Sequence, residues 1–153
     1  MQSLDLKIPP PAVGVLVGLA MWGVASISPL LDMSTPTRVA AGIAIVLAGG
    51  AFSLSGAVSF RRARTTINPM KPEAASALVS TGIYRFTRNP MYVGILLALV
   101  GWAVFLAAPW ALLGPLAFCL YISRFQIAPE ERALSKLFGA EYTAYQAKVR
   151  RWL

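Results

Sequence analysis

Residues 81–94 read TGIYRFTRNPMYVG and stand directly before an apolar segment. The stretch holds two arginines, two tyrosines and one asparagine, and its Pro90 suits the first turn of a helix, where a missing N–H costs little. Polar side chains therefore gather where an apolar helix begins. We expect the fold to be organised around this point.

A second polar cluster follows after one more apolar hairpin. It consists of Arg124, Glu130 and Glu131. Two polar patches that are joined by an apolar helical hairpin should meet on the same face of a membrane. The sequence therefore predicts a candidate site where these two patches come together.

The composition is that of a membrane protein. Of the 153 residues, 57% are hydrophobic and only 13% are charged, and the mean hydropathy is +0.63. These values predict an all-α integral membrane protein with one domain over residues 1–153. The net charge of +8 would suggest nucleic acid in a soluble protein. Here Lys and Arg adjoin apolar runs, as charges that set topology do, so we expect no nucleic-acid partner.

Metal and disulfide chemistry are not indicated. The chain has no histidine and one cysteine, Cys119, which lies within an apolar run. No cluster with metal-ligand spacing can be drawn, so we expect no metal. Cys119 is expected to be a small buried hydrophobic residue, and its presence leaves the redox compartment open.

Four apolar segments are long enough to span a bilayer, and they predict transmembrane helices over residues 12–31, 36–60, 91–107 and 110–127. Thr35 can cap the second helix, with Pro36 at its first position. A polar connector over residues 65–80 is expected to lie over the membrane surface. Gly94, Ala98 and Gly101 share one face of the third helix, which either packs against the fourth helix or leaves a groove for a flat ligand.

After residue 128 the pattern becomes that of an amphipathic helix over residues 129–149, expected to lie along the membrane interface. Gly139 is expected to break or bend it. Its apolar positions recur at steps of three and four residues: Leu134, Phe138, Tyr142, Tyr145, Val149 and Trp152.

The distribution of basic residues predicts the orientation. Most basic residues fall on one side of the predicted membrane: Lys7, the group over residues 61–88 and all basic residues from Arg124 onward. Arg38 is alone on the other side. Because basic residues are retained in the cytoplasm, we expect both termini and both polar patches to be cytoplasmic.

Each candidate site residue also has a plainer interpretation. Glu130 and Glu131 follow Pro129, and acids in a first turn stabilise the helix dipole by ~0.3–1 kcal/mol. Arg85 and Arg88 can anchor lipid phosphates, and tyrosines are common at the membrane interface. The residues alone predict a cytoplasm-facing pocket with both acidic and basic side chains. They do not indicate a reaction.

Two motifs resemble those of the membrane methyltransferases that act on isoprenylcysteine carboxylates and on phospholipid amines. The first is Arg88-Asn89-Pro90-Met91-Tyr92-Val93-Gly94. The second begins at Glu130-Glu131 and continues with Phe138-Gly139-Ala140-Glu141-Tyr142-Thr143-Ala144-Tyr145. The resemblance covers about half of the chain, residues 80–153.

This resemblance implies that S-adenosylmethionine binds at the cytoplasmic ends of the last two membrane helices, closed over by the C-terminal segment and without a Rossmann fold. It places cofactor contacts on six residues: Arg88, Asn89, Tyr92, Gly94, Glu130 and Glu131. If the acceptor is an amine, the available bases are Glu130, Glu131 and Tyr92. Arg85, Arg124 and Tyr84 are the candidate substrate contacts.

The motifs conflict about the acceptor. Asn89 replaces the histidine that is common in the isoprenylcysteine branch and agrees with phospholipid methyltransferases, whereas the C-terminal motif is closer to the isoprenylcysteine branch. We therefore expect a lipid or lipophilic substrate that enters from the cytoplasmic leaflet. A nicotinamide-dependent membrane reductase of related architecture and a non-enzymatic small helical membrane protein remain as alternatives.

Overall fold

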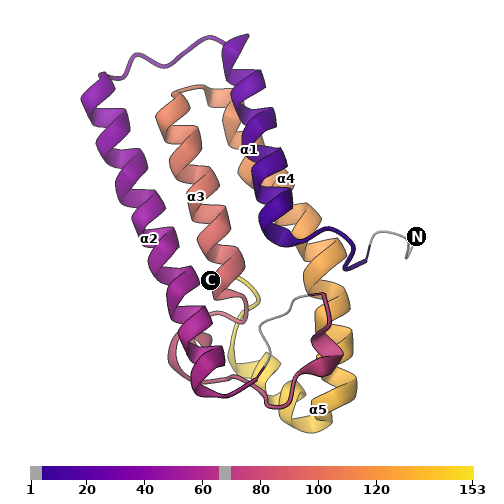
Figure 1. Cartoon of the computed structure of the whole chain (residues 1–153). Helices are drawn as coiled ribbons and strands as arrows, with labels where there is room; N and C mark the ends of the chain where they lie inside the picture. The colour runs from indigo at the N-terminus through magenta and orange to yellow at the C-terminus, as the bar shows by residue number, and fades with distance from the viewer. Residues whose placement is uncertain (1–4, 66–69) are drawn as a thin grey trace.

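The computed structural model describes residues 5–65 and 70–153, and helices make up its regular structure within these ranges (Figure 1). The α-helices are α1 (Pro10–Ser26), α2 (Thr35–Arg62), α3 (Pro90–Leu106), α4 (Leu113–Ile122) and α5 (Ala128–Lys148). Short 3₁₀ helices are η1 (Pro72–Ala74), η2 (Gly82–Arg85) and η3 (Pro109–Leu112), and η4 (Ser123–Ile127) is π-helical. Helices α1 to α4 run alternately up and down, and α5, η1 and η2 gather at one end. The all-α prediction is confirmed.

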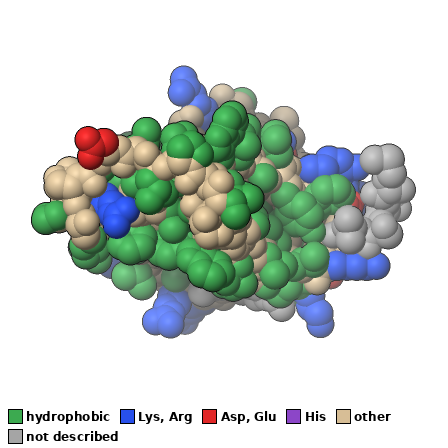
Figure 2. Space-filling model, turned by 90° about the horizontal axis from the view of Figure 1, so that it is seen from above, with side chains coloured by type: hydrophobic (Ala, Val, Ile, Leu, Met, Phe, Trp, Pro, Cys, Tyr) green, Lys and Arg blue, Asp and Glu red, His purple; other side chains and the backbone are tan. Residues whose placement is uncertain are grey.

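The bundle presents apolar side chains to its surroundings. Leu47 and Leu54 of α2 are 68% and 69% exposed, and Figure 2 shows many hydrophobic side chains, among polar groups and backbone, on the end of the bundle that it views. Two helical runs, Thr35–Arg62 and Pro109–Lys148, are long and apolar enough to cross a membrane, whereas α1 and α3 are shorter apolar helices. These features are those of an integral membrane protein. That all four helices cross the bilayer stays a prediction.

The first helix ends earlier than the predicted residue 31. Its last turn is closed by serine side chains, since Ser26 Oγ donates to Gly23 O at 2.7 Å and Ser28 Oγ donates to Val24 O at 2.6 Å. Pro29 cannot continue the helix because it has no N–H. The following helix is capped by Ser34, whose Oγ accepts from the backbone N–H of Thr37 at 3.3 Å, so the assignment of the cap to Thr35 was wrong.

The predicted separation of a fourth helix ending at residue 127 from an amphipathic helix beginning at residue 129 is also wrong, because the chain is helical from 109 through this point as far as the bend at Gly139. Pro129 has no N–H for the carbonyl of Phe125, four residues earlier. The wider π-helical turn η4 precedes it, and the free Phe125 carbonyl accepts from the N–H of Leu6 at 3.0 Å. The N-terminal segment thus satisfies the acceptor that the proline leaves open.

Helix α3 packs closely against α2 through glycines that recur every seven residues. Gly42 faces Gly101, and a Cβ on Gly49 would lie 2.6 Å from the carbonyl oxygen of Gly94. Small residues permit such a close approach of two backbones. The glycines of this stripe therefore pack against the second helix, so the alternative in which the stripe packs against the fourth helix was wrong. Ala98 instead lines an apolar groove between α1 and α3.

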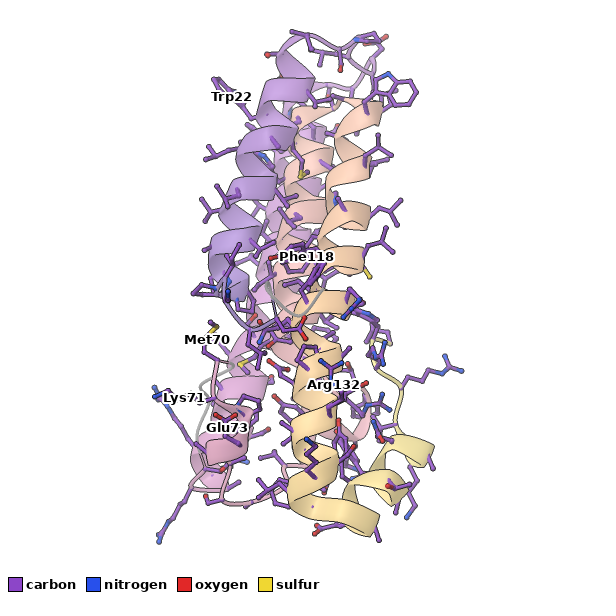
Figure 3. The ribbon with its side chains drawn as sticks, turned by 90° about the vertical axis from the view of Figure 1, so that its right-hand side faces the viewer. Trp22, Met70, Lys71, Glu73, Phe118 and Arg132 are labelled. Carbon is purple, nitrogen blue, oxygen red and sulfur yellow. The ribbon has the colours of Figure 1, made fainter. Side chains whose placement is uncertain are left out.

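Helix α1 completes the bundle by packing against α3 and α4. Gly14 lies against Ile95, and Gly114 lies against Met21. Phe118 points into the interior and is fully buried, whereas Trp22 is 60% exposed on the outer surface (Figure 3).

The C-terminal helix forms a second apolar core with the connector and η2. The core consists of Val79, Tyr84, Tyr142, Tyr145 and Val149, with Leu134 and Phe138 packed against it. The amphipathic pattern is thereby confirmed. Gly139 has φ 51° and ψ −122°, so the predicted bend is confirmed as well. The placement of α5 along a membrane interface stays a prediction, and connector residues 66–69 lie outside the described ranges.

Two adjacent glycines of α2 provide a matched test of the α2–α3 contact. Gly49→Ala should lower the free energy of unfolding by about 1–3 kcal/mol, because its Cβ would overlap the Gly94 carbonyl. A Cβ on Gly50 would meet nothing within 4 Å among the described residues beyond its own helix backbone, so Gly50→Ala should stabilise the helix by up to about 1 kcal/mol. Thermal unfolding in detergent measures both. Equal effects of the two substitutions would contradict the close packing.

Candidate active site

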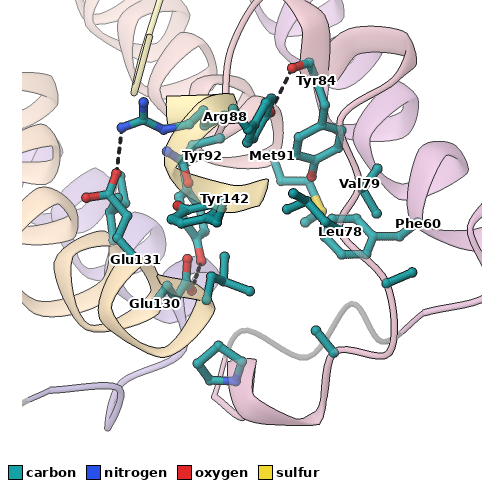
Figure 4. A pocket seen from close by; sticks show the side chains of 17 residues that line it. Phe60, Leu78, Val79, Tyr84, Arg88, Met91, Tyr92, Glu130, Glu131 and Tyr142 are labelled. Atoms are coloured by element: carbon teal, nitrogen blue, oxygen red, sulfur yellow. Dashed lines mark hydrogen bonds and ion pairs between the residues drawn. The ribbon is translucent and has the colours of Figure 1, made fainter. Parts of the chain in front are cut away.

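The two motifs meet in one pocket at the end of the bundle where α2 ends and α3 begins (Figure 4). The pocket has an empty volume of about 820 Å³, part of which is open to solvent. Helix α5 forms one wall and the connector before η2 forms another. The side chains that line it are those of Phe60, Pro72, Ala75, Ala77, Leu78, Val79, Tyr84, Arg88, Asn89, Met91, Tyr92, Ile127, Glu130, Glu131, Leu134, Tyr142 and Tyr145.

Glu131 forms ion pairs with two arginines. Its Oε1 accepts from Nη2 of Arg88 at 2.8 Å and from Nε of Arg151 at 3.0 Å, and its Oε2 accepts from Nη2 of Arg151 at 2.5 Å. Burial opposes ionisation of this carboxyl, but the hydrogen bonds from Arg151 and Arg88 outweigh it and lower the pKa of Glu131. Glu131 is therefore a charged carboxylate at neutral pH.

Arg88 and Asn89 also hold the C-terminal segment through its backbone. The N–H of Arg88 donates to the carbonyl of Arg150 at 3.0 Å, and its Nη1 donates to the carbonyl of Val149 at 2.6 Å. Nδ2 of Asn89 donates to the carbonyl of Arg151 at 2.9 Å. The first motif thus fixes the end of the chain beside the pocket.

Glu130 has a different environment from its neighbour. Its Oε1 accepts hydrogen bonds from the hydroxyl of Tyr92 and from Nε2 of Gln126, each at 2.5 Å. Burial raises the pKa of Glu130 to about 7, against these two hydrogen bonds, which favour the charged form. A carboxyl group with this pKa can hold or release a proton near neutral pH.

Tyrosines line much of the remaining wall. The hydroxyl of Tyr145 donates to the carbonyl of Tyr84 at 2.7 Å, and the ring of Tyr84 meets Phe60 edge to face with 5.4 Å between centroids. Burial raises the pKa of Tyr142 to about 12 and raises the pKa of Tyr84 and of Tyr145. These phenols are therefore neutral, and the wall combines aromatic surface with hydroxyl groups.

The structure brings together most of the predicted site residues. Tyr84, Arg88, Asn89, Tyr92, Glu130 and Glu131 all line the pocket. Gly94 lies against α2. Arg85 lines a separate surface hollow with Glu141 and Lys148, and Arg124 lies 3.9 Å from the carboxylate of Asp5. The roles assigned to all these residues stay predictions.

Sequence reasoning missed Gln126 and Arg151. Gln126 is 2% exposed, and its one sequence signal is an amide within an apolar run, four residues before Glu130. Arg151 lies among C-terminal basic residues that resemble topology signals. Across the described ranges, no group of His, Cys, Asp and Glu side chains could hold a metal ion.

The chain belongs to the phospholipid methyltransferase family, whose model matches residues 37–141. This match covers most of α2, all of α3 and α4 and most of α5, and so includes every residue that lines the pocket except Tyr142 and Tyr145.

Several known proteins are similar to this chain. An uncharacterized protein of Haemophilus influenzae is 49% identical over 63 residues, which are 41% of this chain and all of that protein. A probable protein-S-isoprenylcysteine O-methyltransferase of Oryza sativa subsp. indica is 34% identical over 111 residues, which are 71% of this chain and 56% of the relative. The corresponding Saccharomyces cerevisiae enzyme is 34% identical over 82 residues, 52% of this chain and 33% of the relative. This chain thus spans about half the length of the plant relatives. No solved structure matches.

The raised pKa of Glu130 predicts a specific pH dependence of stability. Between its ordinary pKa of 4.5 and about 7, the folded state binds more protons than the unfolded state. The free energy of unfolding should therefore fall as pH rises through this range, by at most about 3 kcal/mol from this group. Glu130→Gln should remove that fall. The contribution of Glu131 has the opposite sign and is lost only as pH falls below 4.5.

Thermal unfolding in detergent from pH 4.5 to 8 measures this effect. Glu141→Gln is the matched control, because Glu141 is exposed on the same helix. Parallel curves for the wild type and Glu130→Gln would show that Glu130 titrates normally.

Proposed function

We propose that this protein binds S-adenosylmethionine in the pocket and transfers its methyl group to a lipid or lipophilic acceptor at the cytoplasmic face of a membrane. One observation carries the proposal. The two polar motifs, separated by an apolar hairpin in the sequence, meet in a single pocket whose residues fall mostly within the matched family region.

The residues of the pocket fit this cofactor. Apolar and aromatic side chains such as Phe60, Leu78 and Tyr84 suit a flat base. Arg88 lines the pocket and has a buried Nε–H without a partner among the described residues, which suits a carboxylate. Glu130 and the faces of the tyrosines suit cationic groups. S-adenosylmethionine supplies, when bound, a methyl group made electrophilic by its sulfonium.

The protein's own residues contribute mainly by holding the reactants in place. Positioning of two reactants can lower a barrier by ~7–11 kcal/mol, and a histidine is not needed for it. If the acceptor is an amine, it must lose a proton, and Glu130 is the group with a suitable pKa. The hydroxyl of Tyr92 and the amide of Gln126 hold this carboxyl in place. A carboxylate acceptor would need no base.

We propose a phospholipid amine as the acceptor and an isoprenylcysteine-type carboxylate as the second candidate. Glu130 supports the amine because only this acceptor makes use of a base. Exposed Arg61, Arg62, Arg64 and Arg85 lie on the same end of the protein. Basic residues near an anionic leaflet attract it by ~1 kcal/mol each. This supports an acceptor head group that enters sideways from the cytoplasmic leaflet.

Cofactor binding can be measured without a known acceptor. Purified wild-type protein should bind S-adenosylhomocysteine in calorimetry, and Glu130→Gln should weaken binding or turnover with little loss of stability. A role limited to the helix dipole predicts instead intact binding and a stability loss of about 1 kcal/mol or less. Glu141→Gln, which changes an exposed acid of the same helix, should leave binding unchanged. Lack of binding by correctly folded wild type would refute the cofactor assignment.

The acceptor can be found by labelling. Incubation with S-adenosylmethionine that carries a labelled methyl group and with total membrane lipid should place label in the organic phase. Base-stable label would indicate an N-methylated lipid, and base-labile label would indicate an ester. Label confined to water-soluble small molecules would exclude entry from the leaflet.

A further inference from the structure

Arg151 gives the polar cluster beside the pocket an excess of positive charge. Two guanidinium groups, those of Arg88 and Arg151, share the single Glu131 carboxylate. The formal charge of the three side chains is therefore positive by one unit. Without Arg151 the remaining pair of Arg88 and Glu131 would be neutral.

The backbone of the C-terminal segment is held independently of the Arg151 side chain. Its carbonyl groups accept from the N–H of Arg88 and from Nδ2 of Asn89, at 3.0 and 2.9 Å, and Nη1 of Arg88 reaches the carbonyl of Val149 at 2.6 Å. Removal of the Arg151 side chain leaves these bonds in place. Its charge can therefore be changed without releasing the segment.

Arg88 has an unused hydrogen-bond donor next to the pocket. Its side chain is 11% exposed, and its Nε–H is buried without a partner among the described residues. A buried donor without an acceptor is unfavourable, so part of the Arg88 guanidinium is unsatisfied in a residue that lines the pocket. The planar guanidinium and the excess charge both favour a carboxylate.

We infer that Arg151 is a positioning residue for the ligand's carboxylate. By pairing with Glu131, Arg151 leaves Arg88 with uncompensated positive charge. The amino-acid carboxylate of an adenosyl amino acid then binds at the Arg88 end of the pocket. This inference rests on the proposed function, because it assigns one end of the same pocket. Glu130 and Tyr92 then face the cationic part of the ligand.

Two probes separate charge recognition from general integrity of the pocket. S-adenosylhomocysteine carries the amino-acid group, and 5′-methylthioadenosine has the same adenosine and thioether without it. In calorimetry with the full chain in detergent, Arg151→Ala should lower the affinity for S-adenosylhomocysteine by about tenfold or more. The same substitution should change the affinity for 5′-methylthioadenosine by less than about twofold.

Arg150→Ala is the matched control. Arg150 is the adjacent residue, its side chain is exposed, and its carbonyl still accepts from the N–H of Arg88 after the substitution. Both probes should bind this variant as they bind the wild type.

A double substitution tests the charge directly. Arg151→Ala with Glu131→Gln restores the excess positive charge of the cluster, so binding of S-adenosylhomocysteine should recover at least in part. A role of Arg151 in holding the fold predicts that the double variant binds more weakly than the single one. Arg151→Lys keeps the charge and should retain a preference for S-adenosylhomocysteine over 5′-methylthioadenosine.

The outcomes distinguish the inference from the proposed function. If folded wild type binds neither probe, the proposed function fails. Three results would overturn the inference about Arg151 while the proposed function stands, provided that the wild type binds S-adenosylhomocysteine. Arg151→Ala could lower the affinity for both probes equally, or it could have the same affinities as Arg150→Ala. Alternatively, the added Glu131→Gln substitution could fail to raise the affinity of Arg151→Ala for S-adenosylhomocysteine. If circular dichroism shows that Arg151→Ala does not fold, the test uses Arg151→Lys and the double variant instead. Loss of the preference for S-adenosylhomocysteine over 5′-methylthioadenosine in either variant overturns the inference.

Discussion

The polar end of this protein depends on the pairing of Glu131 with Arg88 and Arg151. These side chains come from the first turn of α5, the turn before α3 and the C-terminal segment, which are distant in the sequence. A partly buried ion pair stabilises little by itself, because desolvation offsets the attraction, but the loss of one partner leaves the other charge uncompensated. The pairing therefore acts mainly as a constraint that, together with the backbone hydrogen bonds from Arg88 and Asn89, fixes where three segments lie relative to one another.

The apolar bundle brings these segments within reach. Glycines at residues 42 and 49 let α2 approach α3 closely, and Gly56 lies against Pro90 and Met91 at the start of α3. The end of α2 and the start of α3 are thereby held side by side, and the motif around Arg88 is placed opposite α5. Close packing of small residues in the bundle and ion pairing at its end thus serve the same arrangement.

Two adjacent carboxyl groups acquire different properties in this arrangement. Glu131 has two cationic partners and stays charged, whereas Glu130 has the neutral donors Tyr92 and Gln126 and a pKa of about 7. Pairs of titratable groups whose environments drive their pKa values apart commonly divide acid–base and structural roles. Here one glutamate pairs with the guanidinium groups of Arg88 and Arg151, and its neighbour is left able to exchange a proton in the pocket.

The sequence by itself determined the helical class, the approximate bounds of most helices, the bend at Gly139 and the meeting of the two polar motifs, because each of these follows from local hydrophobic pattern, backbone preference and chain connectivity. Only the tertiary structure decided that the Gly94 and Gly101 stripe packs against α2, that Arg124 pairs with Asp5 outside the pocket, and that Arg151 and Gln126 flank the two glutamates. These depend on which faces of different helices meet and on which side chains share a buried space. Such contacts between distant residues leave no periodic signal in a single sequence.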